Sequence, residues 1–496
     1  MRMHNHVGAD LRVCPDEKDN SNERTQKRAN TQVRPYKSNL PEGWQIVSLS
    51  EVAEINPKID KSKIANDTMV SFVPMQAVGA GDGRIDTSVK KHFADVRKGY
   101  TPFQPNDVLF AKITPCMENG KIAVVPVLHN NLGFGSTEFY VIRPKDGIDP
   151  HYICYYISRL DYRKEAASKM TGAVGQKRVP TDFIKSSTIP LAPFDQQKRI
   201  VSEIEKQLSR LDEAITALKR IQANLRRYKA SVLKAAVEGK LTEEWRGKNP
   251  EIEPASELLK RILAERKKKW EEKNPGKKYK EPSTPDTSNL PELPRGWVWA
   301  TVEQLAVKVQ YGSSAKTNES SSGVPVLRMG NIFEGQLKLD DLKYLPKNHS
   351  EFPDLLLEKG DLLFNRTNSP ELVGKTAVYA GNPDPCSFAS YLIRVKMADG
   401  IKSNFVSFYI NSVYGRKWIK TVVSQQVGQA NVNGTKLQAL LIPLPPDTEQ
   451  RKIIEEVESR LSVAEEIEEA IDANLQRAER LRQSILKQAF SGKLVK

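Results

Sequence analysis

The sequence predicts an α+β fold with two similar mixed α/β domains, each followed by a long helix, and the two helices pair as an antiparallel coiled coil. Two observations predict it. A stretch of 53 residues starting at Ile189 recurs at Ile442, so its copies are displaced by 253 positions. The segments that precede each copy repeat at nearly the same displacement. A duplication of this length indicates two like units about a pseudo-two-fold axis rather than a solenoid.

Both copies of the repeated stretch have the pattern of a long helix. Prolines end the strand before each copy, because proline has no N–H to donate to a sheet, and Gly239 and Gly492 mark the far ends. Apolar residues recur in steps of three and four, which is the spacing of a coiled-coil seam. A helix of roughly 60 Å, at 1.5 Å per residue, cannot bury such a stripe alone, so each needs a long partner. The predicted seam residues are Val201, Ile204, Leu208, Leu211, Ile215, Leu218, Ile221, Leu225, Tyr228 and Val232, and then Ile454, Val457, Leu461, Ala464, Ile467, Ile471, Leu475, Ala478, Leu481 and Ile485.

The charges of the two helices favour pairing within the chain. Between Gln196 and Glu238 the first helix carries ten Lys or Arg against five acids, and the second carries the acidic run EEIEEAID from Glu465 to Asp472. Aligning the midpoints of antiparallel helices places this run close to Lys219 and Arg220. A single charge run is as often a solvated face. The opposite biases favour pairing, although each flanking pair contributes only tenths of a kcal/mol.

Composition points to a nucleic-acid partner. The chain has 496 residues and a formal charge of +15, and nucleic acid is the commonest polyanion that such a protein meets. No apolar run approaches the ~20 residues needed to span a bilayer, so we expect a cytoplasmic protein without a membrane partner. The four cysteines lie far apart without CxxC spacing and indicate neither a disulfide framework nor a zinc site.

The domains before the two helices also repeat. LPEGW at Leu40 matches LPRGW at Leu293, PNDVLFAKIT matches KGDLLFNRTN, and the Gly-Gln pair at Gly175 recurs at Gly428. An amphipathic helix recurs too, and its expected buried face is Tyr152, Ile153, Tyr156, Ile157 and Leu160, matched by Phe405, Val406, Tyr409, Ile410 and Val413. The predicted organisation is a disordered extension at 1–38, a first domain at 39–190, a first long helix at 191–241, a basic linker with a short amphipathic helix at 242–290, a second domain at 291–443 and a second long helix at 444–496.

Catalytic motifs are weak in this sequence. The segment from Leu372 to Thr376 ends like a phosphate-binding loop, but Ser369 stands where that loop needs glycine. We expect it to be a turn between two strands. Asn382-Pro383-Asp384-Pro385 does not match the Asn-Pro-Pro-aromatic loop of amino-methyltransferases, and no glycine-rich S-adenosylmethionine loop occurs elsewhere. Duplication, basic charge and missing motifs together favour a binding protein over an enzyme.

The order of the motifs resembles one known family. The LPEGW and LPRGW openings, GDLLF, the Gly-Gln turns, IPLPPDTEQRKII and the AFSGKL ending are similar to the specificity subunit of type I restriction-modification systems. The resemblance runs from Leu40 to the C-terminus. It implies a non-catalytic subunit whose two target recognition domains are separated by the paired helices. It also implies assembly with two adenine-methyltransferase (M) subunits and with restriction (R) subunits. S-adenosylmethionine, ATP and Mg would be bound by these partners, so we expect no cofactor in this chain.

The paired helices and duplicated domains predict a bipartite target on double-stranded DNA. The half-sites would be separated by an unread gap and would differ, because the two domains differ. Candidate reading residues are polar or basic residues in loops that follow buried strands and around the Gly-Gln turns. Arg can bond guanine and Asn or Gln can bond adenine in a bidentate manner, but a phosphate contact that carries no sequence information is an equally good interpretation. The candidates are Lys112, Thr114, Gln176, Lys177, Arg178, Asn365, Arg366, Thr367, Asn368, Gln429 and Asn431.

Two other functions stay open at this stage. A coiled-coil protein that binds nucleic acid without sequence preference would lose affinity for cognate and scrambled duplexes alike as salt rises. A self-contained DNA-modifying enzyme, such as a methyltransferase or nuclease, would bind S-adenosylmethionine or a metal as an isolated chain.

Overall fold

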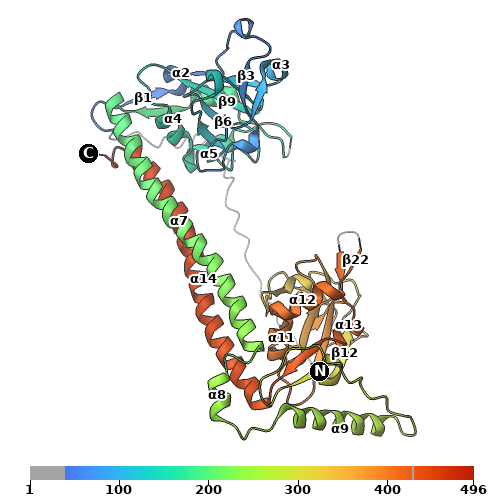
Figure 1. Ribbon diagram of the computed structural model, residues 1–496. Coiled ribbons are helices and arrows are strands. Elements are labelled where there is room, and N and C mark those ends of the chain that lie inside the picture. Colours follow the sequence, from blue (N-terminus) through green and yellow to red (C-terminus); the bar gives the residue numbers. More distant parts are fainter. Residues whose placement is uncertain (1–39, 174, 427–428, 496) are drawn as a thin grey trace, which may run out of the picture. The chain divides into compact units, whose positions relative to one another are not determined.

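The computed structural model describes residues 40–173, 175–426 and 429–495. The extension predicted at 1–38 lies outside these ranges. The chain divides into two compact units, one formed by residues up to 213 with 477 onward, and one formed by 214–476. Each unit holds one domain and parts of both long helices (Figure 1). Among the described residues, no helix combines the length and hydropathy needed to cross a membrane.

Two four-stranded sheets form the domain of the first unit. One has the order β2-β9-β6-β7 and is antiparallel throughout, and the other has the order β4-β3-β8-β5 and includes one parallel pair, β3 with β8. A separate pair, β1 with β10, joins the start of the domain to its end. The strands are β1 (Gln45–Ser48), β2 (Ala53–Ile55), β3 (Met69–Val73), β4 (Lys90–His92), β5 (Thr101–Phe103), β6 (Val108–Ala111), β7 (Ile122–Val124), β8 (Gly133–Gly135), β9 (Phe139–Pro144) and β10 (Thr188–Leu191). The helices are α2 (Leu49–Val52), α3 (Phe93–Val96), α4 (Pro150–Ile157), α5 (Leu160–Ser168), α6 (Thr181–Ser186) and the first long helix α7 (Phe194–Val237).

The residues of strand β6 explain the layering of this domain. All four are buried, since one face of the strand packs against helices and the other against the second sheet. Val108 and Phe110 belong to the core shared with α4 and α7, whereas Leu109 and Ala111 belong to the core between the two sheets. Side chains alternate between the faces of a strand, so a continuous apolar run is what a strand covered on both faces requires.

The domain of the second unit repeats this architecture. Its sheets have the orders β12-β21-β17-β19 and β16-β13-β20, and β11 pairs with β24 as β1 pairs with β10. The strands are β11 (Val298–Thr301), β12 (Ala306–Tyr311), β13 (Val324–Leu327), β14 (Ile332–Phe333), β15 (Gln336–Leu337), β16 (Lys343–Leu345), β17 (Leu362–Asn365), β18 (Thr367–Asn368), β19 (Thr376–Val378), β20 (Ser387–Phe388), β21 (Leu392–Met397), β22 (Ser424–Gln426), β23 (Gln429–Asn431) and β24 (Leu441–Leu444). The helices of this unit are α8 (Glu243–Lys248), α9 (Ala255–Lys273), α10 (Val302–Leu305), α11 (Ser403–Asn411), α12 (Val413–Val422), α13 (Gly434–Gln438) and the second long helix α14 (Asp447–Ala489), whose end lies in the first unit.

The structure contains the predicted turn before Thr376 and most of the two predicted buried helix faces. Gly374 has a φ of 78° and stands two residues before the start of β19, which pairs antiparallel with β17. The segment that ends like a phosphate-binding loop therefore connects two strands. The amphipathic faces of α4 and α11 are buried except for their last predicted members. Leu160 and Val413 are exposed, because each helix ends earlier and each of these residues begins the next helix.

The aspartate of the repeated NDVLF and GDLLF motifs has a structural role. Asp107 accepts hydrogen bonds from the Gln104 N–H and from the Arg143 guanidinium, all at 2.7 Å. Asp361 accepts from the Glu358 N–H at 2.9 Å and lies 3.5 Å from Arg394. Both carboxylates are buried, so each ion pair ties two neighbouring strands of its sheet together.

A buried glutamine joins each long helix to its own domain. Gln197 accepts from the Asp149 N–H at 3.0 Å and donates to the Ala192 carbonyl at 2.9 Å. Gln450, displaced by 253 positions, accepts from the Lys402 N–H at 2.8 Å and donates to the Pro445 carbonyl at 3.1 Å. The side chain therefore fastens the first turn of the helix to the loop before α4 or α11, and the duplication extends to individual hydrogen bonds.

The two long helices run antiparallel in both units. Asp212 pairs with Arg482 in the first unit, and Gln222 donates to Asp472 at 3.2 Å in the second, so the residue numbers sum to 694 in both contacts. The acidic run at 465–472 therefore faces residues 222–229. Its Asp472 end reaches to within one helical turn of Lys219 and Arg220, but the run is not centred on them, as midpoint alignment would place it. Midpoint alignment fails because the first turns of each helix pack against a domain, as Ile204 and Val457 do, and the paired regions begin later.

The apolar seam is less continuous than its spacing predicts. Ile221, Tyr228, Ile467 and Leu481 are 41–49% exposed, although they belong to the predicted seam. Two helices cover only part of each other's circumference, whereas these stripes are wide enough to meet further helices. Exposed apolar residues therefore run along a helix pair whose other seam residues, such as Ala464 and Ile471, are buried.

Candidate nucleic-acid interface

A small sheet brings the candidate residues of the second unit together. β18 pairs with β23, and β23 pairs with β22, which places Thr367 opposite Asn431 and Asn368 opposite Ala430. The chain thus continues past the buried end of β17 as β18, which pairs with the hairpin formed by β22 and β23. Gly428, half of the second Gly-Gln pair, lies outside the described residues. The two loops that sequence reasoning selected separately form one surface.

The first unit has the same arrangement in a reduced form. Single antiparallel bridges join Ile113 to Arg178 and Thr171 to Arg178. These pairs correspond to Thr367 with Asn431 and Ser424 with Asn431 in the second unit, at displacements of 253 or 254. Thr114 donates its N–H to the Lys177 carbonyl at 3.0 Å and accepts from the Lys177 N–H at 3.1 Å. The candidate surface is therefore duplicated together with the domains.

Lys112 and Arg366 occupy equivalent places at the strand ends. The backbone N–H of Lys112 donates to the Glu138 carbonyl, and the Lys112 carbonyl accepts from the Val179 N–H, both at 2.9 Å. The Lys112 ammonium lies 5.3 Å from the centre of the Tyr140 ring. The Arg366 N–H and carbonyl bond Tyr391 and Val432 in the same way. The Arg366 guanidinium lies 4.9 Å from the Tyr311 ring, and its Nη1 donates to the Ser390 carbonyl at 3.2 Å. Both cations are thus oriented by an aromatic ring.

Several candidate side chains already have protein partners. Arg178 donates to both carboxylate oxygens of Glu138, at 2.9 and 2.8 Å, and this hydrogen bonding holds the pKa of Glu138 below its usual range. Asn431 donates to the Thr367 hydroxyl at 2.7 Å, and Asn368 accepts from the Ser369 N–H at 2.8 Å. These three side chains shape the surface, and they must exchange partners before they can reach a base.

Other candidates differ in exposure. Gln176, Lys177 and Gln429 are exposed and lie on the hairpin segments, where a ligand can reach them. Asn365 is buried and its Nδ2 lies 3.5 Å from the Met329 carbonyl, while its Oδ1 has no hydrogen-bond partner among the described residues. Asn365 lies beneath the surface and supports the loop rather than facing solvent.

Sequence reasoning missed two exposed tyrosines. Tyr311 and Tyr391 lie beside Arg366 and are 43% and 48% exposed. Both lie in or next to strands, where an aromatic residue is usually predicted to be buried. The sequence carries no signal that distinguishes these exposed tyrosines from the buried Tyr140. Exposed tyrosines beside an arginine are typical of a binding surface.

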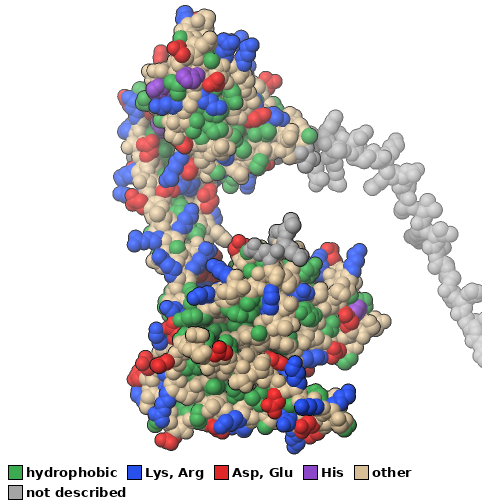
Figure 2. Space-filling model, turned by 45° about the vertical axis from the view of Figure 1, so that its right-hand side comes forward, with side chains coloured by type: hydrophobic (Ala, Val, Ile, Leu, Met, Phe, Trp, Pro, Cys, Tyr) green, Lys and Arg blue, Asp and Glu red, His purple; other side chains and the backbone are tan. Residues whose placement is uncertain are grey.

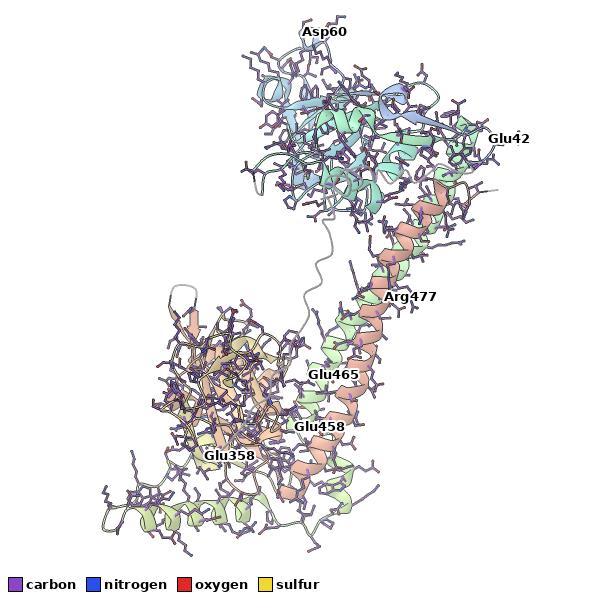
Figure 3. The ribbon with its side chains drawn as sticks, turned by 180° about the vertical axis from the view of Figure 1, so that it is seen from behind. Glu42, Asp60, Glu358, Glu458, Glu465 and Arg477 are labelled. Carbon is purple, nitrogen blue, oxygen red and sulfur yellow. The ribbon has the colours of Figure 1, made fainter. Side chains whose placement is uncertain are left out.

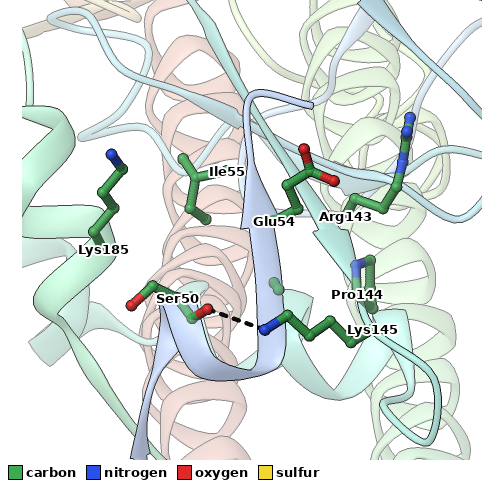
Figure 4. A pocket seen from close by; sticks show the side chains of 8 residues that line it. Ser50, Glu54, Ile55, Arg143, Pro144, Lys145 and Lys185 are labelled. Carbon is green, nitrogen blue, oxygen red and sulfur yellow. Dashed lines mark hydrogen bonds between the residues drawn. The ribbon is translucent and has the colours of Figure 1, made fainter. Parts of the chain in front are cut away.

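A shallow pocket in the first unit is separate from these residues. It is lined by Ser50, Ala53, Glu54, Ile55, Arg143, Pro144, Lys145 and Lys185 (Figure 4). Two of its three cations are already engaged, since Arg143 bonds Asp107 and Lys145 donates to the carbonyls of Ser50 and Glu51. None of the candidate residues lines it, so we assign it no ligand.

Charged side chains are dispersed over the surface. Figure 2 shows Lys and Arg side chains spread over the visible face, with acidic side chains between them. In the described parts of the chain, no group of three or more His, Cys, Asp or Glu is placed to hold a metal ion.

Duplicated domains on paired helices, each with a polar surface at its strand ends, define a class of two-domain nucleic-acid recognition proteins. The family model described as "Type I restriction modification DNA specificity domain" matches residues 41–227 and 294–477. The chain therefore belongs to the specificity subunits of type I restriction-modification systems, which are the non-catalytic DNA-recognition subunits of those complexes.

Relatives and solved structures agree with this assignment. The chain is 29% identical to the EcoAI specificity subunit of Escherichia coli over 86% of this chain and 79% of that protein. It is 27% identical to the EcoKI specificity subunit of E. coli K12 over 92% and 90%. The fold matches the HsdS subunit of Thermoanaerobacter tengcongensis with a TM-score of 0.52 at 22% identity, over 92% of this chain and 99% of that one. A chain from a structure of the assembly of a type I R-M system matches with a TM-score of 0.64 at 22% identity, over 92% and 100%.

Proposed function

We propose that this chain directs a methyltransferase complex to an asymmetric, bipartite site on double-stranded DNA, with one half-site read by each domain and an unread gap between them. One observation carries the proposal. The same pairing of strand ends occurs in both domains, as a small sheet in the second and as single bridges in the first, but its side chains differ. Lys112 stands where the second domain has Arg366, and Arg178 stands where it has Asn431. Different donors and acceptors on equivalent scaffolds favour different bases, so the half-sites differ.

The proposed partners are two M subunits and the R subunits of the same system. Exposed apolar residues on the long helices support this. Tyr228 and Leu481 are displaced by 253 positions, and both are exposed. Exposed apolar residues at equivalent positions of the repeat would form two similar binding sites for two copies of one partner, because a duplicated unit presents the same surface twice. S-adenosylmethionine, ATP and Mg would then be bound by the partner subunits.

The test of this proposal is reconstitution of the complex from its purified subunits. The M subunits with this chain should methylate adenine only in duplexes that contain both half-sites. The isolated chain should bind no S-adenosylmethionine. Stoichiometric binding of S-adenosylmethionine by the isolated chain would instead support a self-contained enzyme. Equal affinity for cognate and scrambled duplexes would support a non-specific nucleic-acid-binding protein.

Arg366→Ala should change or abolish the sequence that the complex methylates, without disturbing assembly with the M subunits. The guanidinium lies at the end of β17 over the Tyr311 ring, and loss of a bidentate contact to a base costs about 1–3 kcal/mol of discrimination. Sequencing of methylated DNA measures this result. Lys347→Ala, which removes the same charge from an exposed loop of the same domain, serves as the control. Unaltered methylation by the Arg366 variant would remove this residue from the reading set.

Lys177→Ala should weaken binding to all duplexes by a similar factor. Lys177 is exposed on the hairpin of the first unit, and an ammonium is a point charge suited to phosphate. The slope of log affinity against log salt should fall by about one for the loss of one phosphate contact. Fluorescence anisotropy at several salt concentrations measures the slope. A change in sequence preference with an unchanged slope would assign Lys177 to base reading instead.

A further inference from the structure

A short hairpin reaches from the second domain to both long helices. Strands β14 and β15 pair antiparallel and are joined by Glu334 and Gly335, whose φ angles are 49° and 88°. Positive φ at both central residues defines a type I′ turn, the tightest connection between two strands. Glycine adopts this conformation readily, whereas glutamate rarely does. The tip of the hairpin therefore has one defined shape.

The base of the hairpin is fixed to its domain. Ile332 is buried and Leu337 packs against the same core, between the domain's inner strands. The Asn331 side chain is also buried, and its Nδ2 donates to the carbonyls of Lys338 at 2.8 Å and Asp340 at 3.1 Å. Its Oδ1 accepts from the Arg328 N–H at 2.9 Å. These contacts make the hairpin move with the domain as one body.

The tip of the hairpin contacts α7 and α14 together. Gln336 donates to the Glu465 carboxylate of α14 at 2.7 Å, and Figure 3 shows Glu465 on the side of α14 that faces this domain. The Glu334 carboxylate lies 3.9 Å from the ammonium of Lys229 on α7. Lys229 also pairs with Glu468 on α14 at 2.5 Å, and its side chain is only 18% exposed. The hairpin thus meets the helix pair where the two helices are themselves joined.

The contacts of the hairpin tip lie far along α14 from the start of that helix. The start of α14 is fastened to the domain at Gln450 and then through an apolar core that reaches Val457 and Leu461. The hairpin adds a contact at Glu465, beyond this core and 15 residues, or about 22 Å, from Gln450. The core holds one edge of the domain against the helices, and a contact beyond that edge opposes tilting about it.

We infer that the β14–β15 hairpin is a strut that holds the second recognition domain at a fixed tilt on the spacer helices. Glu334 and Gln336 are positioning residues, and they restrict the gap length that the complex accepts between half-sites. The inference rests on the proposed function, because tilt affects the gap only if this domain reads a half-site. Each contact is a partly exposed polar pair that contributes little to stability, so its effect lies in orientation.

The double variant Glu334→Asn/Gln336→Ala tests the strut in the assembled methyltransferase complex. Asparagine tolerates positive φ, so the turn is kept, and Lys229 keeps its partner Glu468. Asp340→Asn, an exposed change just beyond the hairpin, is the matched control. The substrates are duplexes whose gap is native, or one base pair shorter or longer.

The wild-type and control complexes should prefer the native gap, and the double variant should lose about tenfold of that preference, which corresponds to about 1.4 kcal/mol. The half-site sequences and the melting temperature should not change. A double variant with the wild-type gap preference would overturn the inference, as would one that loses half-site sequence preference instead.

A distance measurement on the full chain separates failure of the strut from failure of the proposed function. Spin labels at Val463 on α14 and Asn348 in the domain, in a chain whose Cys14 and Cys116 are replaced by serine, report the tilt without DNA. The distance distribution should broaden in the double variant and stay narrow in the Asp340→Asn control. Equal widths would overturn the strut. A wild-type complex without a bipartite target would overturn the proposed function, whatever the labels report.

Discussion

Arg246→Met should lower the free energy of unfolding of the second unit by about 3 kcal/mol, the low end of the range for leaving a buried charge without its ionic partner. The Glu449 carboxylate is 1% exposed and accepts from the Arg246 Nε at 2.9 Å, the Trp297 indole at 2.9 Å and the Thr242 hydroxyl at 2.7 Å. Without Arg246, two neutral donors must hold a buried negative charge. Urea unfolding of the full chain, with hydrogen exchange read at residues 297–305, measures the loss in this unit.

The chain contains its own control for this prediction. At the equivalent place in the first unit, the Gln196 side chain accepts from the Trp44 indole at 3.0 Å, so a neutral acceptor fits there. Adding Glu449→Gln to the Arg246 variant should therefore recover at least half of the lost stability. A double variant no more stable than the single one would show that the unpaired carboxylate does not cause the loss.

Removal of one heptad from each long helix should shorten the gap that the complex recognises while both half-sites stay readable. The antiparallel register within the second unit gives the matched segments, since residues 218–224 lie opposite 470–476 when paired numbers sum to 694. Seven residues correspond to about 10 Å of helix, or at most about three base pairs at 3.4 Å each. A heptad keeps each helix face nearly in phase, so the pairing survives.

The heptad variant should methylate duplexes with a shorter gap and lose activity on the original one. Methylation assays on duplexes whose gap varies by single base pairs measure the shift. Removal of the heptad from α7 alone is the informative control, because it breaks the register and should disrupt the pair. Methylation of the original gap by the matched variant would contradict a rigid spacer.

Much of the fold was predictable because the duplication is visible in the sequence. The displacement between Ile189 and Ile442 paired the helices, and the repeated strands defined two like domains. The stagger between the helices was not predictable, because it depends on how many helical turns pack against each domain. Ile204 and Val457 satisfy the heptad pattern whether they face a helix or a domain, and the spacing alone does not distinguish the two.

The candidate interface was predictable by position but not by the state of each side chain. The motifs selected the segments that the structure joins, by a small sheet in the second unit and by single bridges in the first. The Arg178 ion pair was not predictable, because Glu138 lies 40 residues away on another segment. The exposure of Tyr311 and Tyr391 was not predictable for the same reason. Tertiary pairing decides which polar residues are free, and local sequence carries no record of it.

The most direct test of the central claim is a map of methylated adenines in DNA from cells that carry the partner M subunits, with and without this chain. If this chain supplies the specificity, the methylated adenines should lie in one asymmetric sequence of two short blocks separated by a fixed gap. This methylation should be lost when the chain is absent. A methylation pattern that does not depend on this chain, or a single uninterrupted target, would contradict this claim.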